Sequence, residues 1–506
     1  MTITTLLLTL AVVFGLVSWI YSGVFLALTV ENARFWKVHK KSPAPSPHTY
    51  ARSCVIIPCK GVEPGLRENL TAFLRQDHPN YEVFFVLERQ SDPAAKLIYN
   101  LIEENRCVKT RVIIAGRAEN CGQKVHNLRM ATKQLSNEID VLVFADSDAK
   151  PQKSWLRWLV NGIGREGLGA RTGYRWMLPA KNNFPTLAVC SINNAVASML
   201  GRGNHYLVWG GSWAIHRRIF DDIGIREAWF GGLSDDLVAS RAIHKANLKV
   251  EFEPQCVCTS TVGFTTAGMT EFLRRQLLIG RQYAPKYWYS AFALVAGSQI
   301  GFWSALLVGV WGISQNMAIG YISMASFVLL YAMGVGRSAV RANLGRRSFT
   351  VWKNHKKARK FDMFAGPVIG AVTFASMVAS CFGSEIVWRG IRYFIGRGGR
   401  VLVMGRQLPE GAWPVNTEEG PEPVPALKLA EFTEPVAVAE NNPVTEVQPN
   451  QIQMSVVETT AAKPAVPLPS STKHPTTTAQ DGGIPWDLHA VASPKPNHDR
   501  SQRDVA

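Results

Sequence analysis

The chain has 506 residues, of which 47% are hydrophobic and 18% charged, and its formal net charge is +17. This length allows about two to four domains. Apolar residues gather in segments 5–30 and 290–388, while 15 of the 28 prolines lie in 407–506. A wholly disordered chain, a disulfide-rich secreted module and a simple soluble monomer therefore describe it poorly. The eight cysteines lack the paired spacing of a zinc site, and we expect reduced cytoplasmic thiols.

The first apolar segment, 6–30, contains no charged residue. Its length of about 25 residues is enough to cross a bilayer core of roughly 30 Å. A signal peptide fits less well, because the apolar stretch is too long and no basic segment precedes it. Four basic residues follow closely: Arg34, Lys37, Lys40 and Lys41. The positive-inside rule then predicts a transmembrane anchor over 1–32, with residue 31 onward in the cytoplasm.

Short β-branched segments then alternate with helical ones. The expected strands cover 54–58, 81–87, 111–115 and 141–145, and the expected helices cover 64–75, 93–105, 126–135 and 151–163. This alternation predicts an α/β fold with a parallel, Rossmann-like sheet in a soluble domain over 50–268. Ligands of such sheets bind beyond the carboxyl ends of the strands. The turn after the first strand, Cys59-Lys60-Gly61, lacks G-x-G-x-x-G, which argues against a dinucleotide-dependent dehydrogenase.

A candidate binding lysine, Lys124, stands just before the third expected helix. In this position it either meets a diphosphate near a helix N-terminus or is an ordinary surface lysine. The sequence leaves both interpretations open.

The fourth expected strand runs directly into Asp146-Ser147-Asp148. In an extended chain residues i and i+2 share a face, so both carboxylates are expected to point into one crevice. Converging carboxylates repel each other unless a cation joins them, and Mg²⁺ or Mn²⁺ suits oxygen ligands and bridges to a substrate diphosphate. The alternative is a solvated turn, since D-x-D also occurs by chance in loops. The position at a strand end favours the metal site.

The loop Trp209-Gly210-Gly211 allows a close approach of the backbone to a ligand. Its aromatic ring either stacks on a sugar or a base, or packs in the core. Further on, Asp235-Asp236 opens an expected helix over 237–246. Ser234 or Asp235 is suited to cap that helix. The functional alternative is a general base, a carboxylate held in a cleft near a hydroxyl that must lose its proton.

Residues 269–289 form a basic amphipathic segment just before the second apolar region. Arg274, Arg275 and Arg281 stand among leucine, isoleucine and phenylalanine, as in a helix that lies at a membrane interface. These arginines face either lipid headgroups or the diphosphate of a nucleotide.

The second apolar region, 290–400, is expected to hold two or three membrane segments. Segments 291–313 and 317–336 form an apolar hairpin, and the loop 337–360 carries nine Lys/Arg and no Asp/Glu, which is typical of a cytoplasmic loop. A further candidate, 363–387, is interrupted by a Gly-Pro pair and a glutamate. Four full crossings would leave the C-terminus outside, yet five arginines follow. One segment is therefore expected to be re-entrant or interfacial.

The segment 407–506 is rich in Pro, Thr, Val and Glu and is expected to be disordered. It holds six Lys/Arg against thirteen Asp/Glu, so the positive excess belongs to residues 1–406. Beside apolar segments, such an excess is expected to face the anionic bilayer surface rather than nucleic acid.

Seven motifs in this order resemble those of the ceramide glucosyltransferase family and its bacterial relatives, including hopanoid-type glycosyltransferases. The resemblance covers about residues 1–400. The motifs are Cys59-Lys60-Gly61-Val62-Glu63-Pro64, Asn80-Tyr81-Glu82-Val83 with Ser91-Asp92-Pro93-Ala94, Gln123-Lys124-Val125-His126-Asn127-Leu128, Asp146-Ser147-Asp148, Trp209-Gly210-Gly211-Ser212, Ser234-Asp235-Asp236, and Val387-Trp388-Arg389-Gly390-Ile391-Arg392-Tyr393.

This resemblance implies a family 2-like, multi-pass membrane glycosyltransferase, of the bacterial inner-membrane type, with a cytoplasmic GT-A domain. It implies inverting transfer of a hexose, glucose first, from a UDP-sugar to the hydroxyl of a membrane lipid such as ceramide. The enzyme would be a hexosyltransferase that makes a glycolipid in sphingolipid metabolism, with Mg²⁺ or Mn²⁺ and without a covalent enzyme intermediate.

By position in the motifs, Asp236 would be the general base, and Asp146 and Asp148 would hold the metal. The implied nucleotide-sugar site comprises Lys60, Glu88, Asp92, Lys124, Asp146 and Arg275. The residues implied to contact the acceptor or the sugar are Trp209, Gly211 and Asp235.

One motif departs from the family pattern. The interfacial helix usually carries (Q/R)-x-x-R-W, whereas the segment from Arg275 has Leu278-Ile279 in place of Arg-Trp. Arg281-Gln282-Tyr283, one turn further on, is a candidate to compensate. The alternatives are transfer of an N-acetylhexosamine to a hopanoid-type lipid, a processive polysaccharide synthase, and a catalytically silent membrane scaffold with the same fold.

Overall fold

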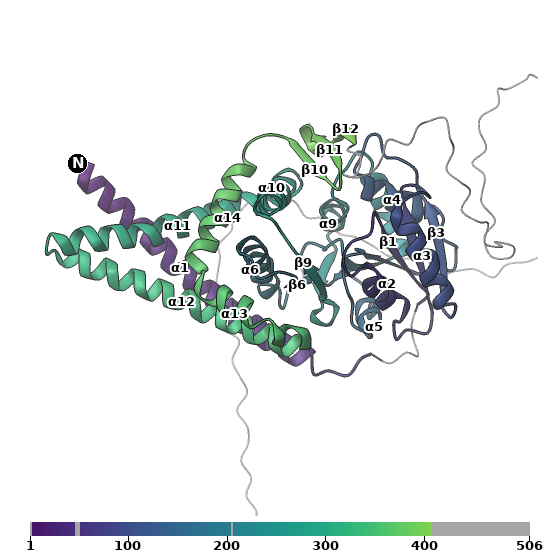
Figure 1. Cartoon of the computed structure of the whole chain (residues 1–506), viewed down its shortest axis with the longest axis horizontal. Helices are drawn as coiled ribbons and strands as arrows, with labels where there is room; N and C mark the ends of the chain where they lie inside the picture. Colours follow the sequence, from purple (N-terminus) through teal and green to yellow (C-terminus); the bar gives the residue numbers. More distant parts are fainter. Residues whose placement is uncertain (1–2, 46–50, 204–205, 407–506) are drawn as a thin grey trace, which may run out of the picture. The chain divides into compact units, whose positions relative to one another are not determined.

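A computed structural model describes residues 3–45, 51–203 and 206–406 of the chain (Figure 1). The predicted disordered tail, 407–506, lies outside the described residues.

The soluble domain is built on a seven-stranded sheet of order β3-β2-β1-β4-β7-β5-β8. Its strands are β1 (Ser53–Pro58), β2 (Tyr81–Leu87), β3 (Lys109–Ile114), β4 (Val141–Ala145), β5 (Leu168–Thr172), β7 (Ser212–His216) and β8 (Lys249–Phe252). The first four are parallel, as the sequence predicts, but β7 is antiparallel to both β4 and β5. The sheet is therefore mixed. The alternation of strands and helices in the sequence predicts only its parallel, Rossmann-like half, which is formed by β1 to β4.

Helices cover both faces of this sheet, which is why its central strands are apolar throughout. Along β1, Cys54 and Ile56 pack on one face, and Val55 and Ile57 pack on the other. The helices of this domain are α2 (Leu66–Leu74), α3 (Pro93–Glu104), α4 (Gln123–Thr132), α5 (Trp155–Val160), α7 (Arg217–Asp222), α8 (Ile225–Ala228) and α9 (Asp235–Lys245).

A second layer connects the domain to the apolar helices. The parallel strands β6 (Arg175–Pro179) and β9 (Cys258–Val262) form a small sheet of their own, with α6 (Phe184–Ser198) packed against β6. The expected interfacial segment is the helix α10 (Thr266–Tyr283), which follows β9 directly. Short 3-10 helices lie at Pro254–Cys256, Thr350–Asn354 and Arg397–Gly399.

Within the described residues, three helices are long and apolar enough to cross a membrane. They are α1 (Ile3–His39), α11 (Pro285–Ser314) and α12 (Ala318–Ser348), and Figure 1 shows them running side by side. Small residues permit this contact, since a Cβ at Gly301 would lie 2.0 Å from the carbonyl oxygen of Phe14. The hairpin expected in this region is formed by α11 and α12, but α12 continues to Ser348, so the first half of the expected loop 337–360 is helical.

The further expected segment, 363–387, does not form one straight helix. Helices α13 (Lys356–Phe364) and α14 (Gly366–Ser380) meet at an angle of 77°, at the Gly-Pro pair. A buried ion pair between Arg341 and Asp362, 2.7 Å long, ties α13 to α12. Helix α14 packs against α10 and α6 of the second layer.

The chain then forms a three-stranded antiparallel sheet of β10 (Glu385–Trp388), β11 (Ile391–Ile395) and β12 (Val401–Arg406), called here the C-terminal sheet. This sheet packs on the soluble domain, where Val401 N donates to Gly231 O at 2.9 Å. The two therefore lie on the same side of any membrane, and the chain between them crosses an even number of times. Two crossings by α11 and α12 would meet this condition, and an additional crossing by the bent pair of α13 and α14 would break it.

Candidate active site

The end of β4 places Asp146 and Asp148 in the wall of one cavity, as their spacing predicts. Asp148 Oδ2 lies 4.0 Å from Arg175 Nη1. Its buried Oδ1 has no hydrogen-bond partner among the described residues. Burial, together with the neighbouring Asp146 carboxylate, raises the pKa of Asp148. An additional cation at this oxygen would satisfy it and relieve the repulsion between the two carboxylates.

Lys124 joins this cluster from the first turn of α4, which begins at Gln123 rather than at 126. Its Nζ lies 2.8 Å from Asp146 Oδ1 and 3.0 Å from Asp235 Oδ1. Burial opposes the charge of the ammonium group, but the surrounding carboxylates outweigh burial and raise the pKa of Lys124. Lys124 is thus a largely buried, charged residue, and the surface-lysine interpretation is wrong.

Asp235 and Asp236 open α9 but face different surroundings. Ser234 caps the helix, since its Oγ accepts a hydrogen bond from Leu237 N. Asp235 is buried, and burial raises its pKa to about 7. Asp236 lines the cavity, and its carboxylate accepts hydrogen bonds from Gly210 N at 3.1 Å, from Leu237 N at 2.8 Å and from the Ser234 hydroxyl. Three donors hold Asp236 in place with its carboxylate at the cavity.

The loop 209–212 needs its glycines in order to approach this cluster. A Cβ at Gly210 would lie 2.7 Å from Lys124 Nζ, and a Cβ at Gly211 would lie 2.4 Å from the Trp209 ring. The Trp209 ring is half-buried, lies 5.6 Å from the Tyr174 ring between centroids, and lines the cavity. It therefore packs in part and also presents a surface to a ligand.

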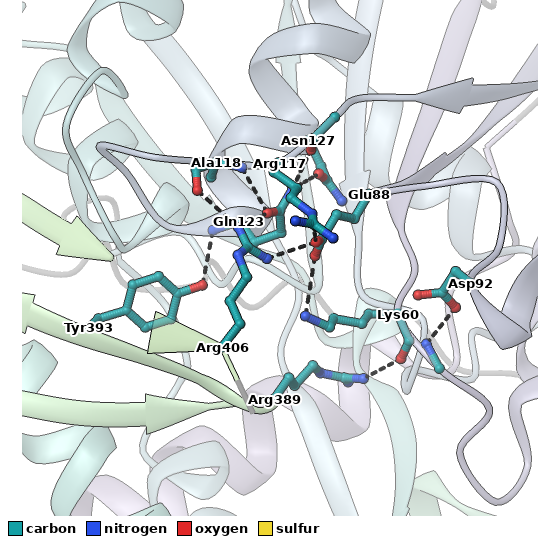
Figure 2. A network of polar contacts seen from close by, with 12 residues as sticks. Lys60, Glu88, Asp92, Arg117, Ala118, Gln123, Asn127, Arg389, Tyr393 and Arg406 are labelled. Carbon is teal, nitrogen blue, oxygen red and sulfur yellow. Dashed lines mark hydrogen bonds and ion pairs between the residues drawn. The ribbon is translucent and has the colours of Figure 1, made fainter. Parts of the chain in front are cut away.

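Three residues expected to bind the nucleotide lie around the turn after β1 (Figure 2). Lys60 lines the cavity, and its Nζ lies 3.3 Å from Glu88 Oε2. Asp92 Oδ1 accepts hydrogen bonds from Gly61 N at 2.8 Å and from Ala94 N at 2.9 Å, so it caps α3 and braces the turn. Glu88 and Asp92 are buried behind Lys60 rather than in the lining of the cavity. Lys60 therefore lines the cavity itself. Glu88 and Asp92 lie behind it and contact Lys60 and the turn that carries it.

The C-terminal sheet supplies residues that the sequence reasoning missed as site residues. Figure 2 shows Arg406 reaching Glu88, with Nη1 2.7 Å from Oε1, and the hydroxyl of Tyr393 accepting a hydrogen bond from Gln123 N at 3.2 Å. Residues of this sheet that line the cavity are Trp388, Arg389, Ile391 and Tyr393. The available signal was the aromatic and β-branched composition of 391–395, which is typical of a strand.

Arg275 lines the cavity, as expected, and its guanidinium lies 5.7 Å from the centre of the Trp388 ring. Burial, reinforced by the nearby arginines, lowers its pKa to about 10. Leu278, which stands where the family pattern has arginine, is fully buried in the core. Arg281 bonds to the carbonyl oxygens of Cys381 and Gly383 rather than lining the cavity. It ties α10 to the end of α14 and does not replace the missing arginine.

The cavity has a volume of about 1270 Å³ and extends well beyond the acidic cluster. One end holds Lys124, Asp146, Asp148 and Asp236. The other end is lined by apolar residues of α10, α11 and α14, including Ile279, Trp288, Ala291 and Met377. The acidic cluster thus lies in the same cavity as an apolar space beside α10, α11 and α14.

The side chains at the polar end of the cavity supply some of the ligands that a divalent cation needs. Among the described residues, no group of three or more His, Cys, Asp or Glu side chains is close enough to hold a metal ion. Asp146 and Asp148 offer two carboxylates, and one buried oxygen of Asp148 has no hydrogen-bond partner in the described part of the chain. Such a pair suits Mg²⁺ or Mn²⁺ when a substrate diphosphate and water complete the coordination.

A model of the family described as glycosyl transferase family 21 matches residues 18–401 of the chain. Among solved structures, the chain is similar to the mannosyltransferase PcManGT from Pyrobaculum calidifontis, in complex with GDP-Man and Mn²⁺, at 17% identity and a TM-score of 0.38, over 72% of this chain and 99% of that one. It is also similar to GalNAc-T7 with UDP, GalNAc and Mn²⁺, at 11% identity and a TM-score of 0.33, over 47% of this chain and 49% of that one.

Proposed function

The chain belongs to glycosyl transferase family 21, and we propose that it transfers a hexose, with glucose as the first candidate, from a UDP-sugar to the hydroxyl of a membrane lipid such as ceramide. The observation that carries this proposal is the cavity that joins the acidic cluster to the apolar walls of α10, α11 and α14. A lipid acceptor has the same two parts, since a polar hydroxyl must reach the reaction centre while its chains remain in apolar surroundings.

The residues divide the chemistry between them. Asp236 would take the proton of the acceptor hydroxyl, since its carboxylate lies at the cavity and is held by three hydrogen-bond donors. The hydroxyl oxygen would then attack C1 of the sugar directly, with inversion. Asp146 and Asp148 would hold a divalent cation, whose charge stabilises the leaving diphosphate.

The remaining expected residues would position the donor. Lys124 would place positive charge near the diphosphate at the N-terminal end of α4. Lys60, supported by Glu88 and Asp92, would contact the nucleotide from the turn after β1. Arg275 would also bind the nucleotide-sugar, whereas Trp209, Gly211 and Asp235 would contact the acceptor or the sugar.

We further propose a multi-pass location with the soluble domain on the cytoplasmic side. The support is the group of basic residues in the last turn of α12 and in the segment after it, which the positive-inside rule assigns to the cytoplasm. It includes the exposed residues Arg346, Arg347, Lys353, Lys356, Lys357 and Lys360.

The test is transfer from radiolabelled UDP-glucose, UDP-galactose and UDP-N-acetylglucosamine into the lipid extract of membranes that contain the full chain. The key variant is Asp236→Asn, and its matched control is Asp222→Asn, an exposed carboxylate on α7. We expect a labelled glycolipid with one donor, unchanged in the control and reduced at least about a hundredfold in Asp236→Asn.

The outcomes separate the alternatives. A glycolipid labelled only from UDP-N-acetylglucosamine would mean that the transferred sugar is an N-acetylhexosamine. A labelled polymer that stays out of the lipid extract would indicate a polysaccharide synthase. A folded protein that gives no product and binds none of the three donors would overturn the proposal in favour of a silent scaffold.

A further inference from the structure

The turn between β10 and β11 places an arginine in an unfavourable backbone conformation. Trp388 pairs with Ile391, which leaves a two-residue turn of Arg389 and Gly390. Both have positive φ, +49° for Arg389 and +73° for Gly390. Turns of this kind favour Asn-Gly, because a longer side chain is strained in the left-handed region. Such strain persists where the surrounding structure enforces it, and it gathers at functional sites.

The side chain of Arg389 enters the polar end of the cavity. Its Nη1 lies 3.0 Å from Glu63 Oε1 and 3.0 Å from the carbonyl oxygen of Lys60 (Figure 2 shows the second contact). Burial opposes its charge, but the carboxylates of Glu63, Asp148 and Asp146 raise the pKa of Arg389. The guanidinium is therefore charged, and it lies within the electrostatic reach of the two carboxylates expected to hold the metal.

Other cations at this end have more buried partners. Lys124 is shared between two carboxylates, and Lys60 pairs with the buried Glu88. The partner of Arg389 is different, because the Glu63 side chain is 42% exposed. An exposed carboxylate loses little when it returns to water, so a stronger anion can take its place on the guanidinium at low cost.

The position of the turn is fixed by contacts elsewhere in the C-terminal sheet. The Tyr393 hydroxyl bonds to Gln123 N in the first turn of α4, and Arg406 bonds to Glu88. These contacts hold the sheet against the domain independently of Arg389. The arginine side chain is therefore not required to attach the sheet, and its strained position needs another explanation.

We propose that Arg389 binds the diphosphate of the nucleotide-sugar donor, exchanging Glu63 for phosphate oxygens when the donor enters. This inference rests on the proposed function, since it presumes a donor with a diphosphate. A guanidinium is suited to this task because its planar array of donors matches two phosphate oxygens. The C-terminal sheet thereby contributes a donor-binding residue, whereas the interfacial helix has Leu278 in place of the family arginine.

The test measures binding of UDP in the presence of Mg²⁺ to the full chain in lipid nanodiscs, by isothermal titration calorimetry. The variant is Arg389→Asn, because asparagine is favoured in this turn and the hairpin should keep its fold. The matched control is Arg392→Asn, which removes the same charge from the exposed face of β11. We expect Arg389→Asn to weaken UDP binding about tenfold or more, as for loss of a hydrogen bond to a charged group. Arg392→Asn should bind like the wild type.

Two further variants separate ligand binding from a structural role. Glu63→Gln removes the competing carboxylate, so it should bind UDP as tightly as the wild type or more tightly. Arg389→Lys keeps the charge and should lose less affinity than Arg389→Asn. If the Glu63–Arg389 pair only stabilises the loop, Glu63→Gln and Arg389→Asn should weaken UDP binding alike, and the inference is wrong.

The control probe is uridine, which has the base and the sugar but no phosphate. Arg389→Asn should bind uridine like the wild type, and an equal loss for uridine and UDP would contradict contact with the diphosphate. Unchanged UDP binding by Arg389→Asn overturns this inference alone. A wild-type chain that binds none of UDP, GDP and ADP overturns the proposed function, and this inference with it.

Discussion

The ammonium group of Lys124 lies 2.8 Å from the carboxylate of Asp146, so an ion pair joins the first turn of α4 to the end of β4. The same group lies 3.0 Å from Asp235 at the start of α9. One cation thus holds together three segments that meet at the polar end of the cavity. Removal of a single member of such a cluster leaves a buried charge without compensation.

We therefore expect Lys124→Gln to destabilise the soluble domain by about 3 kcal/mol or more. Thermal unfolding followed by circular dichroism would measure this as a lower midpoint, with the exposed Lys133→Gln, at the C-cap of the same helix, as control. The double variant Lys124→Gln/Asp235→Asn should recover part of the loss, because it removes one of the carboxylates left unpaired. A double variant no more stable than the single one would show that the ion pair is not the source of the stability.

The buried Asp148 oxygen, which has no hydrogen-bond partner within residues 3–45, 51–203 and 206–406, leads to a prediction about metal dependence. Transfer should stop when EDTA is added and return when Mg²⁺ or Mn²⁺ is restored in excess. Asp148→Asn should need a higher concentration of the metal for half-maximal transfer, because an amide is a weaker ligand than a carboxylate. If transfer continues at full rate in EDTA and Asp148→Asn is as active as the wild type, this carboxylate has another role.

The apolar end of the cavity permits a paired test on one helix. Ala291 of α11 lines the cavity, whereas Ala293 is exposed and lies outside its lining. Ala291→Trp should fill the space proposed for the acceptor and lower lipid glycosylation at least about tenfold, while UDP binding stays unchanged. Ala293→Trp should behave like the wild type in both assays. Equal activity of the two variants would mean that the acceptor enters elsewhere.

A histidine away from the site predicts the response to acid. Burial, followed by the charge of Arg157, lowers the pKa of His78 to about 4. This folded-state value lies below the ordinary value of about 6.5, so the stability that His78 contributes is fully present above pH 6.5 and is lost as the pH falls toward 4. Between pH 7 and pH 4.5 the loss is about 2 kcal/mol.

We accordingly expect the thermal midpoint of His78→Gln to fall less steeply than that of the wild type over this pH range. The control is Lys133→Gln, an exposed substitution that leaves every histidine in place, and its slope should follow the wild type. Parallel curves for all three proteins would exclude His78 as the residue that titrates.

Local pattern was enough to predict the Rossmann-like half of the sheet. Strand β4 is apolar and followed at once by the Asp-x-Asp pair, and both its bounds and the meeting of the two aspartates at one cavity follow from strand geometry. The same holds for Ser234, whose place before α9 predicts a cap. These features depend on neighbours within a few residues, which a sequence displays directly.

Features that depend on distant partners were not predictable in this way. Arg406 bonds to Glu88, 318 positions earlier in the chain, and no short pattern specifies such a contact. The different surroundings of Asp235 and Asp236 likewise follow from the position of Lys124 and the 209–212 loop rather than from the adjacent pair itself. Antiparallel β7 was missed for the same reason, since its partners β4 and β5 are set by the tertiary fold.

The C-terminal sheet also bears on the order in which the protein is made. Ribosomes synthesise the chain from the N-terminus, so α1 and the soluble domain emerge before the apolar hairpin. Four residues of the cavity lining follow only after the hairpin: Trp388, Arg389, Ile391 and Tyr393. Until then one wall of the cavity is missing. A chain that ends before the hairpin therefore lacks part of the lining, and the complete cavity first exists only after α11 and α12 have been synthesised.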